Sequence, residues 1–367
     1  MTSTVRIVML CGDAFGGFGG IAKFNRDFLN ALCGSDQVDQ VRVLPRTLSG
    51  PAGDIPWKIV HEHKAAAGKR AFALRVAACL LRRERVDVVL CGHRNLLPVA
   101  WVLARLKGAQ LVLIIHGFEA WTPGKSRVQN WLSGRIDALV SVSTVSAQRF
   151  CAWSGFPMKD VSILPNCVDL DRFRPQPKDA ALVKRHGLEE SPVIMTVGRI
   201  FSNERYKGFD EVLAAMPKLL ARYPAMKYLI VGDGSDRARL EDKVKVMGLG
   251  DAVVFAGRIE EGEKVAYYNL ADVYVMPSSG EGFGIVLIEA LACGIPVIGS
   301  SVDGARDALL GGELGRLVDP SDSDALIEAV AAALAQGRGK RAAGLDVYSG
   351  HRFKARVSAW IGQACRN

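Results

Sequence analysis

The sequence predicts an α/β chain of two domains, each built around a parallel β-sheet. Short apolar runs typical of buried strands alternate with longer segments of helical spacing. This alternation begins at residues 5–10 and begins again at residues 193–200. The length of 367 residues is enough for two domains of ordinary size.

Composition limits the class of protein further. The eight cysteines are scattered without metal-ligand spacing, which favours reduced thiols over a disulfide framework. No apolar run reaches the about 18 residues of a membrane span, and the first residues lack the pattern of a signal peptide. We therefore expect a cytoplasmic protein, with peripheral attachment to the inner face of the plasma membrane as an open alternative.

The net charge of +9 is unevenly distributed. Residues 1–165 carry ten more cations than anions, whereas the remaining residues carry one more anion than cations. A basic first half can attract nucleic acid, anionic lipid or an anionic acceptor, or it can serve solubility alone.

The first domain opens with a strand, a glycine-rich loop and a helix. The loop contains Gly17, Gly19 and Gly20 and fits the loose dinucleotide pattern G-x-G-x-x-A. No acidic ribose ligand follows the second strand, residues 41–44, so a nicotinamide cofactor is the weaker interpretation. The loop is either a phosphate-facing turn or a tight turn without a ligand.

Two later strands of the first domain are followed by histidines. The further strands are expected at residues 86–90, 109–115, 138–143 and 161–164. His93 and His116 follow the first two of these strands. Because strand carboxyl ends of an open α/β sheet face the ligand crevice, both imidazoles would lie on the rim with the glycine loop. Either can also be a structural histidine.

The segment that follows the strand at residues 41–44 is expected to be irregular over residues 47–68. His61 and His63 would share a face on a strand, but no third metal ligand is evident. The next helix, residues 69–85, has an apolar middle and basic ends. We expect it to pack on the core, and a membrane-surface helix is the alternative.

Cations follow the first strand of the second domain. Gly198 and Arg199 come directly after it, and Lys207 precedes the next helix. A guanidinium and an ammonium beside a helix N-terminus can neutralise a diphosphate, although both can also be solvated cations.

Residues 278–290 are the most informative stretch of the chain. They read as a glycine-rich turn between a strand and a helix, which presents N–H groups and a positive helix end to an anion. The N–H groups belong to Phe283, Gly284, Ile285 and Val286. Glu281 and Glu289 flank the turn, and carboxylates accept hydrogen bonds from vicinal hydroxyls of ribose or a sugar. The stretch therefore predicts a nucleotide-sugar site.

Glu281 and Glu289, with seven residues between them, resemble the E-x7-E signature of retaining glycosyltransferases of the GT-B fold, family 4. Other matching segments follow the family order and cover most of the chain: His116-Gly117, Pro165–Asp169, and Gly198-Arg199 with Lys207-Gly208. Cys167 stands where the family's P-N-G-V-D segment has glycine, so the turn there must differ slightly.

The resemblance implies two Rossmann-like domains facing each other across a cleft. Residues 1–166 would form the acceptor-side domain and residues 167–349 the donor domain, with a helix at 350–367 crossing back to the first. The implied reaction moves a hexose from a UDP- or GDP-sugar to a saccharide or lipid-linked acceptor. Its setting would be the synthesis of a cell-surface polysaccharide, lipopolysaccharide or glycolipid.

The resemblance also assigns roles to residues. Arg199 and Lys207 would neutralise the diphosphate, Glu281 would bind donor-sugar hydroxyls, and His116 would support the sugar near the reacting centre. The donor-binding set would be Gly17, Gly19, Gly20, Gly198, Arg258, Ile259, Phe283, Gly284, Ile285, Val286 and Glu289. Glu289 would hold the ribose.

No cofactor and no metal are expected, since the two cations with backbone N–H groups suffice for the phosphates. Nucleic acid is not expected as a partner, and an anionic membrane surface is kept as an alternative partner. Three alternatives stay open: a nucleotide-sugar 2-epimerase of the same fold, an NADP-dependent oxidoreductase, and a non-catalytic binding module. Intact Arg199, Lys207, Glu281 and Glu289 argue against the last.

Overall fold

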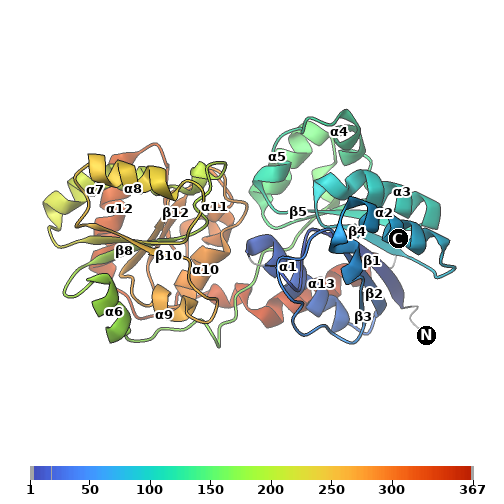
Figure 1. The fold of residues 1–367 in the computed structure, drawn as a ribbon, viewed down its shortest axis with the longest axis horizontal. Coiled ribbons are helices and arrows are strands. Elements are labelled where there is room, and N and C mark those ends of the chain that lie inside the picture. The colour runs from blue at the N-terminus through green and yellow to red at the C-terminus, as the bar shows by residue number, and fades with distance from the viewer. Residues whose placement is uncertain (1–3, 18, 365–367) are drawn as a thin grey trace. The chain divides into compact units, whose positions relative to one another are not determined.

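The structure, a computed structural model, describes residues 4–17 and 19–364. The chain divides into two compact units. Unit 1 comprises the described residues of Met1–Cys167 and Gly350–Asn367, and unit 2 comprises Val168–Ser349. Each unit has its own parallel sheet with helices on both faces (Figure 1). The predicted repetition of one α/β architecture along the chain is therefore observed.

The sheet of unit 1 has seven parallel strands in the order β3-β2-β1-β4-β5-β6-β7. Their bounds are β1 Val5–Cys11, β2 Val38–Pro45, β3 Ile59–His61, β4 Val88–Cys91, β5 Gln110–Ile115, β6 Ala138–Ser141 and β7 Val161–Ile163. The central strands are buried along their length, as expected of a parallel sheet covered on both faces.

One prediction for unit 1 is wrong. Residues 47–68 are not wholly irregular, because β3 pairs with β2 at the sheet edge and a 3₁₀-helix, η1 (His63–Ala67), follows. Three residues are too few to show a strand period in the sequence, and tertiary pairing with Val41 and Val43 defines the strand.

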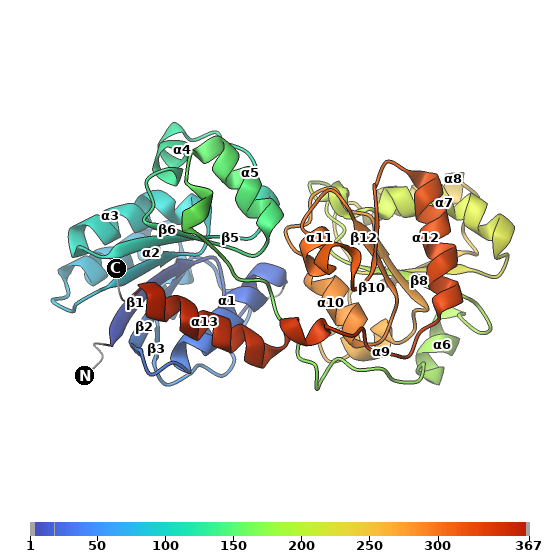
Figure 2. The same cartoon turned by 180° about the vertical axis from the view of Figure 1, so that it is seen from behind.

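Helices cover the two faces of this sheet differently. On one face, α1 (Gly20–Cys33) packs along α13 (Gly350–Ala364), which Figure 2 shows side by side. Phe24 meets Phe353 edge-on at 5.9 Å between ring centroids, and Phe28 lies 5.5 Å from Trp360. The other face carries α2 (Lys69–Leu81), α3 (Leu97–Lys107), α4 (Arg127–Ser133) and α5 (Thr144–Ser154).

Helix α2 packs on the sheet through Phe72, Val76 and Cys79, as the core-packing interpretation expects. It ends at Leu81 rather than at Arg85, because Arg82 already has extended backbone angles. Short 3₁₀ segments complete the unit: η2 Arg94–Leu96, η3 Phe118–Ala120 and η4 Met158–Asp160.

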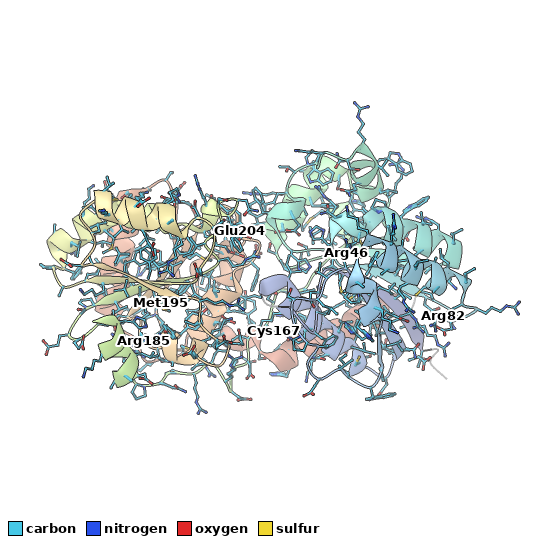
Figure 3. The ribbon with its side chains drawn as sticks, viewed as in Figure 1. Arg46, Arg82, Cys167, Arg185, Met195 and Glu204 are labelled. Carbon is cyan, nitrogen blue, oxygen red and sulfur yellow. The ribbon has the colours of Figure 1, made fainter. Side chains whose placement is uncertain are left out.

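The sheet of unit 2 has six parallel strands in the order β10-β9-β8-β11-β12-β13. Their bounds are β8 Val193–Val197, β9 Lys227–Val231, β10 Val253–Gly257, β11 Val273–Met276, β12 Val297–Ser300 and β13 Arg316–Val318. Met195, on the central strand β8, is fully buried inside the unit (Figure 3).

The helices of unit 2 also form two layers. Helices α7 (Phe209–Arg222), α8 (Arg237–Val246) and α12 (Ser323–Gln336) share one apolar core with the sheet. Figures 1 and 2 place α6 (Ala180–His186), α9 (Lys264–Tyr268) and α10 (Ile285–Ala292) on the opposite face. Helix α11 (Ala305–Ala308) follows β12, and the remaining 3₁₀ segments are η5 Arg205–Lys207, η6 Leu310–Gly312 and η7 Leu345–Tyr348. Across the described residues, no helix is both long and apolar enough to cross a bilayer.

Candidate active site

The carboxyl edge of the unit 2 sheet gathers most of the predicted site residues. Because all six strands are parallel, the segments that follow β8, β10, β11 and β12 leave the sheet at the same edge. These segments are residues 198–207, 258–263, 277–284 and 301–304. The site can therefore be built from the contacts among them.

Lys207 and Glu281 meet at this edge. Lys207 Nζ lies 3.3 Å from Glu281 Oε2, and both side chains are largely buried. Gly198 leaves room for the lysine, since a Cβ at that position would lie 3.3 Å from Lys207 Cδ. Gly280 lies under Tyr206, where a Cβ would approach the ring to 2.5 Å. Close packing of the two loops thus brings Gly198, Lys207 and Glu281 together.

Arg199 leaves the same strand but has its own partner. Its guanidinium forms a 2.5 Å ion pair with Glu204 and is 61% exposed. The structure therefore separates the two predicted cations. Lys207 is enclosed beside Glu281, whereas Arg199 lies at the surface with a carboxylate that a ligand would have to replace.

The N-terminus of α10 lies next to Glu281 in the chain. Gly284 caps the helix at φ 90°, in the left-handed region that favours glycine. The first-turn N–H groups, at Ile285 and Val286, have no preceding helical carbonyl and mark the positive end of the helix dipole. The Phe283 ring is buried against Tyr348 at 5.4 Å, so this residue can offer a ligand its backbone only.

Glu289 is a buried carboxylate held by two residues. The Tyr268 hydroxyl donates to Glu289 Oε2 at 2.8 Å, and Lys264 Nζ lies 3.5 Å from Oε1. Burial raises the pKa of Tyr268 well above 10, so its hydroxyl stays a donor at neutral pH. Glu289 Oε1 has no hydrogen-bond partner among the described residues, which leaves it able to accept a ligand hydroxyl.

Sequence reasoning missed Tyr268 and Lys264. Both lie on α9, the helix before β11, and contact Glu289 only through the tertiary fold. Arg258 and Ile259, which were predicted, follow β10 at the same edge of the sheet, and Arg258 is exposed.

The glycine loop of unit 1 is organised by Asp13. Its carboxylate accepts N–H groups from Ala14 and Gly16 through Oδ1 and from Ser49 through Oδ2, at 2.7, 3.2 and 2.8 Å. A Cβ on Gly17 would lie 2.8 Å from both Asp13 and Ala22 atoms, so Gly17 is required for packing.

Gly19 and Gly20 have a different environment from Gly17. Gly19 caps α1 at φ 96°, Gly20 is the first residue of that helix, and both are exposed. These two glycines, rather than Gly17, are therefore the part of the loop that a ligand can reach. No sequence pattern marks Asp13 beyond its place after β1.

His116 follows β5 and is held as a neutral ring. Burial lowers its pKa, His93 lowers it further, and Glu119 and a hydrogen bond with the Gly92 backbone oppose the shift. Its Nε2 atom is buried without a hydrogen-bond partner in the described part of the chain. Burial likewise lowers the pKa of His93, whose Nδ1 accepts the Asn95 N–H at 3.0 Å.

The low pKa leaves His116 with an acceptor to offer at neutral pH. The structure thus distinguishes the two histidines: His116 has an unused ring nitrogen, and His93 caps η2. Among the described residues, no group of three or more histidine, cysteine, aspartate or glutamate side chains is arranged to hold a metal ion.

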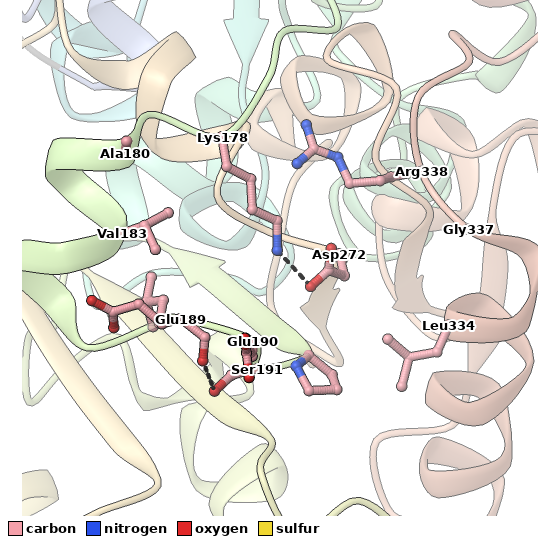
Figure 4. A pocket seen from close by; sticks show the side chains of 12 residues that line it. Lys178, Ala180, Val183, Glu189, Glu190, Ser191, Asp272, Leu334, Gly337 and Arg338 are labelled. Carbon is pink, nitrogen blue, oxygen red and sulfur yellow. Dashed lines mark hydrogen bonds and ion pairs between the residues drawn. The ribbon is translucent and has the colours of Figure 1, made fainter.

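A hollow of about 770 Å³ in unit 2 lies elsewhere, beside Pro192 and Asp272 at the amino ends of β8 and β11 (Figure 4). Its cations are already bound: Lys178 pairs with Asp272 at 2.8 Å, and Arg338 donates to the carbonyls of Asn269 and Gln176. None of the predicted donor residues lines this hollow.

Comparison with known families agrees with the resemblance seen in the sequence. Residues 18–172 match the model of Glycosyltransferase Family 4, and residues 179–345 match the model of Glycosyl transferases group 1. The chain belongs to this family of glycosyltransferases, and the predicted two-domain GT-B fold is confirmed.

Two curated relatives are mannosyltransferases. The chain is 34% identical to a GDP-mannose-dependent alpha-(1-6)-phosphatidylinositol monomannoside mannosyltransferase of Mycolicibacterium smegmatis, over 74% of this chain and 73% of the relative. It is 30% identical to the enzyme of the same description from Mycobacterium tuberculosis, over 89% of this chain and 88% of the relative.

Among solved structures, Anabaena HepE in complex with UDP-glucose superposes with a TM-score of 0.75 at 19% identity. The match covers 98% of this chain and 99% of that protein, and it shows a shared fold.

Proposed function

We propose that the protein is a retaining, metal-independent mannosyltransferase that uses GDP-mannose and acts on a saccharide or lipid-linked acceptor. The observation that carries this proposal is the Lys207–Glu281 pair beside the N-terminus of α10, on the same unit as the buried Glu289. The choice of GDP-mannose rests on the two mannosyltransferase relatives.

The donor would be divided among these groups by chemistry. Lys207, Arg199 and the first N–H groups of α10 would meet the diphosphate, because cations and a positive helix end stabilise anionic oxygens. Glu289 Oε1 would accept a ribose hydroxyl, with Tyr268 fixing the other carboxylate oxygen. Arg258 and Ile259 would flank the base.

The reaction breaks the bond between the anomeric carbon and the β-phosphate oxygen and forms a bond to an acceptor hydroxyl oxygen. Negative charge grows on the leaving diphosphate, and Lys207 and α10 would stabilise it without reorganising. The departing phosphate oxygen would take the acceptor's proton, so GDP leaves on the face from which the acceptor enters, and configuration is retained. His116 Nε2 would accept a hydroxyl of the transferred sugar.

Incubation of the purified protein with GDP-mannose and a phosphatidylinositol mannoside extract tests the proposal. We expect release of GDP together with a lipid product heavier by one hexose, and removal of that hexose by an α-mannosidase. Transfer from UDP-glucose but not from GDP-mannose would contradict the donor assignment, and a β-linked product would contradict retention.

Two controls separate the alternatives. With GDP-mannose alone, a 2-epimerase would change the sugar of the nucleotide, whereas the proposed transferase would leave it unchanged or hydrolyse it slowly. With excess EDTA, transfer should continue, because the phosphates would be met by side-chain cations and N–H groups. Loss of activity that magnesium restores would overturn metal independence.

We further propose that unit 1 binds an anionic membrane through the outward surface of α2, α3 and α4, called here the α2–α4 surface. Of the exposed large apolar side chains in the described residues, twelve belong to unit 1 and three to unit 2. Those on the α2–α4 surface are Leu74, Leu81, Val99, Val102, Leu106, Val128 and Trp131. The three helices carry six cations and no aspartate or glutamate.

This pattern of charged and apolar side chains indicates which partner the α2–α4 surface would bind. Apolar side chains interleaved with cations suit a surface of anionic lipid. Two of the six cations have carboxylate partners outside the three helices, Arg75 in Glu62 and Arg105 in Asp137. The cluster at residues 82–85 contributes less than the sequence suggested, because Arg82 pairs with Glu84 at 3.4 Å and Arg85 pairs with Asp87. The proposal rests instead on the exposed apolar side chains of α3, which are Val99, Val102 and Leu106; Leu106 is 69% exposed.

Co-sedimentation with vesicles tests the α2–α4 surface. Wild type should bind vesicles containing phosphatidylserine, bind less as salt rises, and ignore neutral phosphatidylcholine vesicles. Replacing Val102 and Leu106 by Gln should weaken binding, whereas Val246→Gln on unit 2, at a side chain 87% exposed, should not. Equal binding by all three proteins would reject the surface.

A further inference from the structure

Asp303 lies in the turn after β12 and is fully buried. Its carboxylate receives three hydrogen bonds within unit 2. Oδ2 accepts from the Ser278 hydroxyl at 2.7 Å and from the Glu281 N–H at 2.8 Å, and Oδ1 accepts from the Ala305 N–H at 2.9 Å. An ionised carboxylate is the side chain that can serve three donors, because it has acceptor sites only.

The neighbouring Gly304 holds the other side of Glu281. The Gly304 N–H donates to the Glu281 carbonyl at 2.8 Å, so both backbone polar groups of Glu281 are bound by this turn. A Cβ at Gly304 would lie 2.0 Å from the Gly282 carbonyl oxygen, which shows how closely the turn and the loop are packed. The Glu281 side chain is thereby directed from a fixed backbone toward Lys207 at 3.3 Å.

We propose that Asp303 is a positioning residue for sugar transfer, because its carboxylate fixes the Glu281 backbone and so sets where the Glu281 side chain meets the donor. This inference rests on the proposed function of the same site, in which Glu281 binds the donor sugar.

The electrostatics agree with this geometry. Burial raises the pKa of Asp303 to about 7, the carboxylate of Glu281 adds to the rise, and the bonds from Ser278, Ala305 and Glu281 oppose it. The charged groups around it are Glu281 with its partner Lys207. Arg306 and Asp307 adjoin it on α11. Both carboxylate oxygens of Asp303 therefore accept hydrogen bonds fully above neutral pH, and protonation below neutral pH weakens these bonds.

Calorimetric titration with GDP and with GDP-mannose gives a test that needs no acceptor. In Asp303→Asn the side-chain NH₂ must replace either Oδ2, which faces Ser278 and the Glu281 N–H, or Oδ1, which faces the Ala305 N–H. In both orientations the charge and at least one hydrogen bond that holds this turn against the Glu281 loop are lost. The affinity for GDP-mannose relative to GDP should fall about tenfold, the loss expected for a hydrogen bond to a charged group. Affinity for GDP itself should stay within about twofold, because the nucleotide contacts other residues.

Two further variants keep the test decisive. Asp322→Asn is the matched control, since Asp322 also accepts a backbone N–H, at 2.8 Å from Ala325, but caps α12. It should bind both ligands as wild type does. Ser278→Ala removes one donor without burying an amide, and it should lower the same ratio by a smaller factor. If Asp303→Asn fails to fold, this milder variant decides.

A double-mutant cycle identifies the path of the effect. In a Glu281→Gln background, Asp303→Asn should change the ratio little, because the group that Asp303 positions is already altered. An unchanged ratio in Asp303→Asn, or full additivity with Glu281→Gln, would overturn the inference. If wild type binds neither GDP nor GDP-mannose, the proposed donor is wrong, and the same ratio measured with UDP and UDP-glucose then decides the role of Asp303.

Discussion

The two units share one architecture but differ at the carboxyl edges of their sheets. In unit 2 that edge carries charged side chains held by partners, such as Lys207 with Glu281. In unit 1 it carries a glycine loop fixed by Asp13 and the neutral imidazoles of His93 and His116. Similar sheets thus support different chemistry, because function depends on the segments that leave the strands.

This difference indicates a division of labour. A nucleoside diphosphate needs cations and N–H groups, which unit 2 gathers beside α10. The transferred sugar needs hydrogen-bond acceptors and a membrane needs apolar surface, which unit 1 would offer at His116 Nε2 and on the α2–α4 surface, respectively. Variants on the two units should therefore fail in different ways.

The largest effect is expected from Lys207→Ala. It removes an enclosed cation from the place where the leaving group would gain charge, an interaction worth about 3 kcal/mol, or roughly a hundredfold in kcat. Steady-state transfer assays check this. Lys218→Ala, at an exposed lysine paired with Asp324, is the control and should leave kcat unchanged. The kcat of Arg199→Ala should lie between those of Lys207→Ala and Lys218→Ala, because the Arg199 guanidinium is exposed and already paired with Glu204. A wild-type kcat in Lys207→Ala would show that Lys207 does not stabilise the leaving diphosphate.

Next in size is Glu289→Gln. The amide oxygen can still accept the Tyr268 hydroxyl, but the charged acceptor for a ribose hydroxyl is lost. We expect affinity for GDP and for GDP-mannose to fall equally, by about tenfold. Calorimetry measures both, with the exposed Glu328→Gln as control. A loss for GDP-mannose alone would mean that Glu289 contacts the sugar rather than the ribose.

A variant on unit 1 should leave the nucleotide site intact. His116→Ala should lower the transfer rate by about tenfold, the effect of losing one hydrogen-bond acceptor, while affinity for GDP stays unchanged. Because burial holds the pKa of His116 below its usual 6.5, this ring should cause no loss of activity between pH 6.5 and 8. Weaker binding of GDP in His116→Ala would contradict the proposal that the nucleotide is bound by unit 2 alone.

The last prediction concerns the pH dependence of stability rather than activity. The folded state holds the Asp303 proton up to a pKa of about 7, whereas the unfolded state releases it near 3.8. Stability is therefore lost as pH rises through this window, by at most about 1.4 kcal/mol for each pH unit. Thermal unfolding of Asp303→Asn should show a flatter dependence between pH 4 and 7 than wild type. Parallel curves for the two proteins would show that Asp303 titrates normally.

Much of the fold was predictable because strands of a covered parallel sheet read as continuous apolar runs. The central strands β1, β4, β5 and β8 were anticipated near their observed bounds. The short strands β3 and β13 were not, since three-residue strands have no period and their pairing is tertiary.

The candidate site was predictable in part. The spacing of Glu281 and Glu289 and the order of Gly198 and Lys207 are local signals, and the structure brings Gly198, Lys207 and Glu281 into contact. Their functional roles stay predictions. The supporting residues Tyr268 and Asp303 are distant in sequence from the groups they hold, and no local pattern marks them.

The central claim, that unit 2 binds the nucleotide, is tested most directly by amide hydrogen exchange with and without saturating GDP. We predict slower exchange in residues 198–208 and 278–289, at the ends of β8 and β11 and at the start of α10. The helices α2–α4 should exchange at the same rate in both states. Protection confined to unit 1, with no change at residues 278–289, would contradict the account.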